Sequence, residues 1–274
     1  MWKRLNETAE HLLSLAPFRP ETGIILGTGL GSLIDDIEII SRIPYSVIPN
    51  FPVTTVEGHQ GNLIFGHLGS KPVAALQGRF HYYEGFSMEE TVFPLRVLKL
   101  MGIRQVFLSN AAGGINPAFT IGDLMIIRDH INFFPESPLR GRNIEELGTR
   151  FPDMSEPYDK ALILKARSVA AGMGIQVHEG VYLGNPGPSF ETPAEYTHYR
   201  IIGADAIGMS TIPEVIAARH MSLPVFAVSV ITNVAIPGQF TENTHEDVQM
   251  AANQASSNLA RLFKGVITES PYQI

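Results

Sequence analysis

The stretch Gln105-Val106-Phe107-Leu108-Ser109-Asn110-Ala111-Ala112-Gly113-Gly114 is the most informative part of this chain. Residues 105–109 form an apolar run of strand length and predict a buried β-strand. Residues 111–114, two alanines and two glycines, have almost no side chain, and we expect the strand to end there with its backbone N–H groups accessible. A small anionic or planar ligand could approach such a main chain closely. The segment therefore predicts a small-molecule site at the end of a buried strand.

Strand-like and helix-like segments alternate along the whole chain. Further apolar runs lie at residues 23–26, 62–68, 72–77, 123–128, 176–184 and 225–231, and helical patterns lie at 5–15, 88–101, 157–172 and 244–263. Pro94 is expected to bend its helix, and residues 132–156 are expected to form a long loop. No repeat or low-complexity segment interrupts this order. It predicts one α/β domain over residues 1–274, with a mostly parallel or mixed central sheet.

The composition excludes several classes of function. Of the 274 residues, 45% are apolar and 17% are charged, and the formal net charge is -7. A nucleic-acid binder that works by counterion release is therefore not expected. The chain has no Cys, so it has no disulfide, thiolate nucleophile or cysteine metal site, and its His residues lack metal-ligand spacing. Because no signal peptide or membrane-spanning run is evident, we expect a cytoplasmic protein.

A glycine-rich loop, Gly27-Thr28-Gly29-Leu30-Gly31, follows the first predicted strand. The third glycine of a dinucleotide-binding fingerprint would fall at Ser32, and Asp35 and Asp36 come too early for its ribose-binding acid. The loop suits a phosphate held by N–H groups and the Thr28 hydroxyl, or a tight turn that needs glycine.

A second segment, Gly78-Arg79-Phe80-His81-Tyr82-Tyr83-Glu84-Gly85, combines a guanidinium, an imidazole and aromatic rings. Arg79, His81 and Tyr83 are spaced two apart, so they share one side of an extended segment. Arg and His donors suit phosphate oxygens. The segment predicts a binding wall better than a solvated turn, and His59 could join it.

Two segments place polar side chains before predicted helices. In residues 187–193, Glu191 is either a first-turn dipole partner or a ligand acceptor beside the ring of Phe190. In residues 208–214, Ser210 could cap the helix or bring an anion to its N-terminus. Met209 suits either the core or the apolar face of a sugar.

The strand at residues 225–231 leads into Thr232 and Asn233, whose amide can both donate and accept. Ligands of open α/β sheets lie beyond the carboxyl ends of strands, which favours Asn233 as a ligand contact. His245, near the start of the last helix, is a cap neighbour or a sugar-hydroxyl partner. A serine-nucleophile elbow, Gly-x-Ser-x-Gly, is absent from the sequence.

Taken in order, these motifs resemble the trimeric purine nucleoside phosphorylases that act on 6-oxopurine nucleosides. The resemblance extends from Gly27 to His245. It implies a single α/β domain of the phosphorylase/hydrolase-like type, with a mixed central sheet that forms a partial barrel flanked by helices. It also implies a homotrimer that cleaves inosine and guanosine, or their 2′-deoxy forms, with phosphate as co-substrate. No metal or organic cofactor, nucleic acid or membrane is implied.

The resemblance also assigns site residues position by position. Phosphate contacts are implied for Thr28, His59, Arg79, His81, Ser210 and the backbone of Ala111. Ribose contacts are implied for Tyr83, Met209, His245 and, from a neighbouring subunit, Phe151. Base contacts are implied for Ala112, Gly113, Phe190, Glu191, Ile207 and Asn233. His81, Glu191 and Asn233 are the expected catalytic residues: Asn233 would donate to the departing purine, and Glu191 would accept from its N1–H.

Three other functions remain open. A methylthioadenosine phosphorylase shares the fold and reaction, but is expected to carry Asp at Asn233 and an apolar residue at His245. A non-catalytic nucleoside or nucleotide binder could use the same donors, and would release no base in the presence of phosphate. A nucleotide-dependent oxidoreductase is disfavoured by the glycine spacing.

Overall fold

The computed structural model describes residues 1–27, 31–53, 60–235 and 244–272. Within them one sheet has the strand order β2-β3-β4-β1-β5-β8-β7-β6-β9, with an additional β5–β9 pairing. Its strands are β1 Thr22–Leu26, β2 Glu38–Pro44, β3 Asn62–Leu68, β4 Lys71–Gln77, β5 Gln105–Gly114, β6 Leu124–Asn132, β7 Val177–Gly184, β8 Ala206–Gly208 and β9 Val225–Val234.

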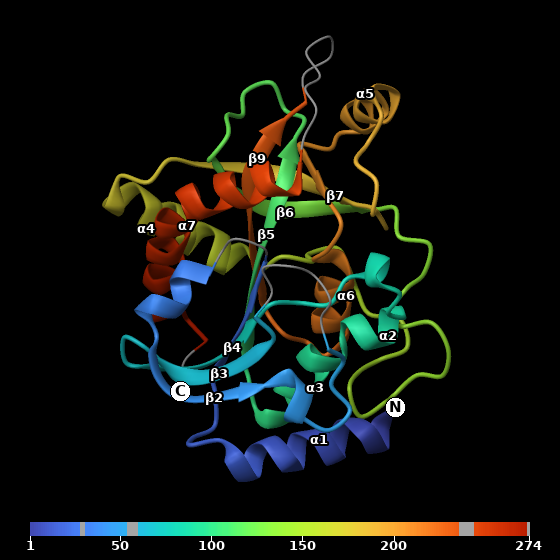
Figure 1. Ribbon diagram of the computed structural model, residues 1–274, viewed down its shortest axis with the longest axis vertical. Helices are drawn as coiled ribbons and strands as arrows, with labels where there is room; N and C mark the ends of the chain where they lie inside the picture. The colour runs from blue at the N-terminus through green and yellow to red at the C-terminus, as the bar shows by residue number, and fades with distance from the viewer. Residues whose placement is uncertain (28–30, 54–59, 236–243, 273–274) are drawn as a thin grey trace.

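The sheet is mixed and partly closed. β1 runs parallel to β4 and β5, β5 runs parallel to β9, and β3 is antiparallel to its neighbours β2 and β4. The β5–β9 pairing joins the ends of the series β5-β8-β7-β6-β9 into a ring. The expected single α/β domain with a partial barrel is therefore confirmed (Figure 1).

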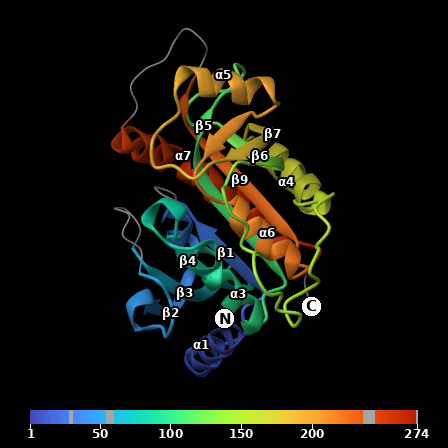
Figure 2. The same ribbon diagram turned by 90° about the vertical axis from the view of Figure 1, so that its right-hand side faces the viewer.

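Helices flank the sheet on both faces, as Figures 1 and 2 show from two sides. α4 (Lys160–Met173) and α7 (His245–Thr268) pack against one another on one face, and α7 contacts β9. α1 (Trp2–Leu15), α3 (Phe93–Met101) and α6 (Ile212–His220) form a connected series on the other. α2 (Met88–Thr91) contacts α3 and α6. α5 (Pro193–Ile201) lies at the end toward which β5 and β9 point (Figure 1).

The core explains why these segments form strands. β1 and β9 are buried almost throughout, and the rings of Phe107, Phe226 and Phe263 pack together between β5, β9 and α7. Continuous apolar runs of this kind are expected in strands that are covered on both faces. Among the described residues, no helix has the length and apolar character that a membrane crossing requires.

The central strand ends within the predicted small residues, at the last of them, Gly114. β5 continues through Gly114, because β9 pairs with it in parallel along its whole second half. Its other edge changes partner: β1 pairs with residues 105–108, and β8 pairs only with Gly113 and Gly114. Residues 109–112 therefore have no strand beside this edge within the described part of the chain. The accessible backbone that the sequence suggested arises at a gap between neighbouring strands.

The prediction for Pro94 also needs correction. Ser87 caps α2 through a capping box with Glu90, but that helix ends after one turn. A separate helix, α3, begins at Phe93 with Pro94 in its first turn. Proline lacks an N–H and is tolerated in a first turn, so it starts a helix here instead of bending one. β2 was not anticipated, because its apolar residues are mostly exposed.

Candidate active site

A cavity of about 360 Å³ opens where β5 loses its neighbour β1 and gains β8. Its lining comes from segments far apart in the sequence: Gly27, Arg79, His81, Tyr83, residues 110–113, Pro188, Phe190, Glu191, Tyr196, residues 207–210, Thr232, Asn233 and Val248. Arg79 and Asn233, which the sequence placed at opposite ends of one ligand, therefore line the same cavity. A cavity of this size suits a small molecule.

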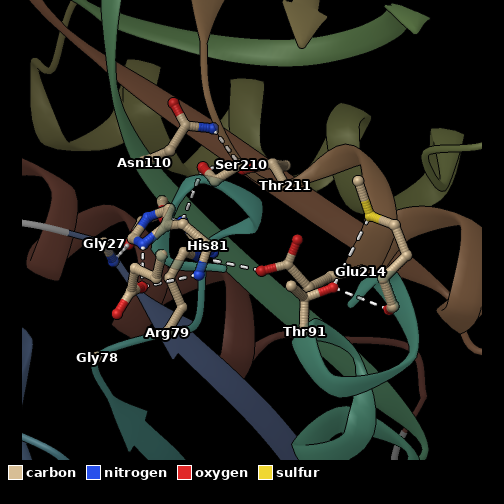
Figure 3. A network of polar contacts seen from close by, with 12 residues as sticks. Gly27, Gly78, Arg79, His81, Thr91, Asn110, Ser210, Thr211 and Glu214 are labelled. Carbon is tan, nitrogen blue, oxygen red and sulfur yellow. Dashed lines mark hydrogen bonds and ion pairs between the residues drawn. The ribbon is translucent and has the colours of Figure 1, made fainter. Parts of the chain in front are cut away.

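Arg79 lies at one end of this cavity and is held there by hydrogen bonds. It is only 3% exposed. Its Nε donates to Glu214 Oε1 at 3.0 Å, and its Nη1 donates to the carbonyl of Ser109 at 2.6 Å (Figure 3). The same Nη1 lies 3.4 Å from Ser210 Oγ. The Glu214 carboxylate compensates the buried guanidinium, which would otherwise be costly to desolvate.

Gly27 lies against this arginine for a steric reason. A Cβ at Gly27 would lie 2.8 Å from the Ser109 carbonyl oxygen, 2.9 Å from Asn110 Cα and 3.4 Å from Arg79 Nη1. Only glycine lets β1 end so close to β5.

Ser210 sits in a strained turn that leads into α6. Thr211 has φ +71° and ψ −51°, a conformation that non-glycine residues rarely adopt, and the N–H of Ile212 donates to the Ser210 carbonyl. The Asn110 amide holds this turn by donating to Thr211 Oγ1 at 2.8 Å (Figure 3). The Ser210 hydroxyl faces the cavity beside Arg79. It does not cap α6, as the sequence had left open.

His81 is fixed by a neighbouring carboxylate. Glu84 Oε1 accepts from the His81 backbone N–H at 2.8 Å and lies 3.0 Å from the ring Nδ1. The ring also stacks on Tyr83, with centroids 4.6 Å apart and planes 14° apart. Burial lowers the pKa of His81, and Glu84 opposes this shift in part. Glu84 and Tyr83 thus fix the orientation of the imidazole at the cavity wall.

Asn233, on β9, lies opposite Gly113 near the end of β5. Its Oδ1 accepts from Thr232 Oγ1 at 3.2 Å, whereas its buried Nδ2 has no hydrogen-bond partner among the described residues. A methyl group on Gly113 would lie 3.2 Å from this Nδ2 and 3.4 Å from Ile207 Cγ2. The floor of the cavity is therefore open enough for a flat ring, and a buried N–H donor is available to it.

Glu191 lies just before α5, whose N-terminus is capped by Thr192. Its Oε1 accepts from Asn185 Nδ2 at 2.7 Å. The buried phenol of Tyr196, one turn into the same helix, also lines the cavity. Burial raises the pKa of Tyr196, and the nearby Glu191 carboxylate raises it further, so this phenol stays protonated.

The two groups of side chains are separated by a distance that β5 sets. Arg79 and Ser210, the arginine group, lie beside Ser109 and Asn110 of β5. Asn233 lies beside Gly113, which pairs with Ile207 and Asn233. Three residues of extended strand span about 10 Å. A sugar ring fits between an anion and a planar base over such a distance.

Comparisons with known proteins give the family of the chain. Residues 21–268 match the model of the Phosphorylase superfamily. The chain is 48% identical to purine nucleoside phosphorylase 1 of Geobacillus stearothermophilus over 96% of both chains. It is 46% identical to the purine nucleoside phosphorylase of Bos taurus over 97% of this chain and 94% of the bovine protein.

The chain belongs to the purine nucleoside phosphorylase family. Like its relatives it is a pentosyltransferase, and it shares the fold of purine nucleoside phosphorylases whose structures are solved. A Schistosoma mansoni purine nucleoside phosphorylase solved in complex with adenosine superposes with a TM-score of 0.92, at 42% identity and over 98% of both chains. A schistosome purine nucleoside phosphorylase solved in complex with hypoxanthine superposes with a TM-score of 0.91, at the same identity and coverage.

The structure brings together most of the residues that the family resemblance singled out. Those that line the cavity are Arg79, His81, Tyr83, Ala111, Ala112, Gly113, Phe190, Glu191, Ile207, Met209, Ser210 and Asn233. Phe151 is the described exception: it is 85% exposed, under the guanidinium of Arg150. Thr28 and His59 lie outside the described residues, as does the side chain of His245.

Several cavity residues had no clear signal in the sequence. Tyr196 lies within a helix whose pattern predicts only packing. The supporting acids Glu84 and Glu214 were visible only as neighbours of other motifs. Asn185 follows β7 directly, and its position at a strand end is the one signal that could have indicated it.

Proposed function

We propose that the protein catalyses the reversible phosphorolysis of inosine and guanosine, and of their 2′-deoxy forms, to free base and (deoxy)ribose 1-phosphate. The observation that carries this proposal is the presence of Arg79, His81 and Ser210 in the same cavity as Glu191 and Asn233.

The arginine group suits orthophosphate. Arg79 has two nitrogens fixed by Glu214 and Ser109, so its orientation costs little entropy when an anion binds. Ser210, His81 and the backbone of Ala111 would complete the contacts, with Thr28 and His59 as further proposed donors. Holding the nucleophile beneath the anomeric carbon accelerates the reaction mainly by proximity and electrostatics.

The reaction needs no further reagent. A phosphate oxygen forms a bond to C1′ while the C1′–N9 bond breaks, and the bonding electrons leave with the purine. Positive charge develops on the sugar and negative charge on the base. The Asn233 amide would donate to N7 or O6 as this charge grows, which is stabilisation of an oxyanion type. We therefore propose that the enzyme uses no metal or organic cofactor.

Glu191 would set the preference for 6-oxopurines. Hypoxanthine and guanine carry a hydrogen on N1 that a carboxylate accepts, whereas adenine presents a lone pair to it. A buried acceptor left unpaired is costly, so adenosine should react poorly. The schistosome protein solved with adenosine fits this proposal if discrimination lies in turnover and not in access to the site.

The sugar would lie between Tyr83 and Met209, with His245 as a partner for a hydroxyl group. We propose a homotrimer in which the exposed ring of Phe151 covers the sugar site of a neighbouring subunit, because a ring 85% exposed has no apolar surroundings in a single chain.

A spectrophotometric assay tests the proposal. Inosine, guanosine, adenosine and methylthioadenosine are supplied with and without phosphate, and the release of free base is followed. Phosphate-dependent cleavage of inosine and guanosine is expected. Comparable kcat/KM for adenosine would contradict the role of Glu191, preference for methylthioadenosine would identify the related phosphorylase, and absence of cleavage would indicate a binding protein.

A further inference from the structure

Asn185 contacts the cavity only through another residue, but both ends of its amide are engaged. Its Oδ1 accepts from the backbone N–H of Gly187 at 3.1 Å, and its Nδ2 donates to Glu191 Oε1 at 2.7 Å. The backbone N–H can only donate and the carboxylate can only accept, so these partners fix which way the amide faces. The residue is 9% exposed.

The backbone around Asn185 is equally fixed. Its N–H donates to the carbonyl of Gly208 at 3.0 Å, which extends the β7–β8 ladder by one residue. Asn185 is therefore anchored to the strand that precedes Met209 and Ser210. Glu191, by contrast, lies in an irregular segment ahead of α5, where the Tyr196 phenol also interacts with its carboxylate.

We propose that Asn185 is a positioning residue that holds the Glu191 carboxylate in the orientation needed to accept the N1–H of a 6-oxopurine. This inference rests on the proposed function. The amide donates to Oε1 and so restricts the plane in which the carboxylate meets the base. A hydrogen bond to an ionised group is among the stronger ones in proteins, and directs its acceptor as well as stabilising it.

Two variants test the role. Asn185→Asp keeps the acceptor for Gly187 but places a second carboxylate against Glu191. Asn185→Leu removes both hydrogen bonds and keeps the branched shape of the side chain. The readout is the ratio of kcat/KM for inosine to kcat/KM for adenosine, with thermal unfolding measured alongside. We expect both variants to lower this ratio about tenfold, because the inosine reaction loses its oriented acceptor and the adenosine reaction never used it.

The pH profile gives an independent readout. Two adjacent carboxylates share a proton when the pH falls, so Asn185→Asp should regain inosine activity at acidic pH, relative to wild type. In a Glu191→Gln background, Asn185→Asp should not change the ratio further, since the two residues act as one unit.

The chain offers a closely matched control. Asn116 Oδ1 accepts from the backbone N–H of Ala118 at 3.0 Å, and its Nδ2 donates to Asp205 Oδ1 at 2.9 Å, outside the cavity lining. Asn116→Asp should lower the unfolding temperature without altering the substrate ratio.

The outcomes separate the two proposals. A wild-type enzyme without preference for inosine would overturn the proposed function, and this role with it. A wild-type preference that survives in both Asn185 variants would overturn the role of Asn185 alone. A ratio that still responds to Asn185→Asp in the Glu191→Gln background would also contradict it, because the effect would then bypass Glu191.

Discussion

Arg79 Nε donates to Glu214 Oε1 at 3.0 Å, and both side chains are almost completely buried. The pair joins the segment after β4 to α6, across 135 residues of sequence. The pair places the Arg79 guanidinium at the cavity, and the Glu214 carboxylate balances its charge from the side away from the cavity. The guanidinium is thereby oriented before any anion arrives.

This pair leads to a prediction for Glu214→Gln. The variant keeps an acceptor for Arg79 but leaves the buried cation uncompensated, and should lower the free energy of unfolding by about 3 kcal/mol. Phosphate should raise the unfolding temperature more in the variant than in wild type, because it supplies the missing negative charge. Thermal unfolding with and without phosphate measures both effects. Equal phosphate-induced shifts would argue against an anion site at Arg79.

Asn233→Ala should lower kcat for inosine on the order of a hundredfold, as for loss of an oxyanion-hole donor. Thr232→Val is the companion variant: it removes the hydroxyl that donates to Asn233 Oδ1 at 3.2 Å but leaves the Asn233 amide in place. Its effect on kcat should be several-fold smaller. Steady-state kinetics with inosine decide the matter, and an unchanged kcat in Asn233→Ala would remove this residue from the mechanism.

The buried imidazole of His81 predicts a dependence of stability on pH. Its pKa is lowered in the folded protein, chiefly by burial, so the unfolded state binds the proton more readily. The stability that neutral His81 contributes is therefore present above the ordinary pKa of about 6.5 and is lost as the pH falls through the lowered value. Urea unfolding at pH 7.5 and 5.5 should show a larger loss in wild type than in His81→Phe.

This comparison is needed because His130 and His220 also have lowered pKa values and contribute to both proteins. If wild type and His81→Phe lose stability equally over this range, His81 is not the group that titrates.

Phe151→Ala tests the proposed subunit contact. Loss of the ring should raise KM for inosine about tenfold with little change in unfolding temperature, because the side chain is exposed within its own subunit and its burial in a partner is worth up to a few kcal/mol. Leu164→Ala, an exposed apolar change on α4, should leave KM unaltered. Sedimentation measures the trimer directly. A monomeric enzyme of full activity would refute the contact.

Much of the fold followed from local pattern. The apolar runs at residues 23–26 and 225–231 became β1 and β9, and the helical pattern at residues 244–263 became part of α7. These features depend on neighbours a few residues away, and periodicity reports such burial well. β2 escaped prediction because its apolar residues Ile39 and Ile40 are adjacent and both exposed, so the sequence does not alternate as a half-buried strand does.

The sequence alone determined the α/β class and the chemical types at the site: a guanidinium, an imidazole, hydroxyls, a carboxylate and an amide in family order. Only the tertiary structure decided how they meet. β5 runs past Asn110 and exposes one edge because β1 stops before β8 begins, and that gap makes the cavity. Likewise, Asn185 bonds Glu191, and Glu214 pairs with Arg79. Such contacts depend on how the sheet closes into a ring, and sheet closure joins residues whose separation in sequence carries no periodic signal.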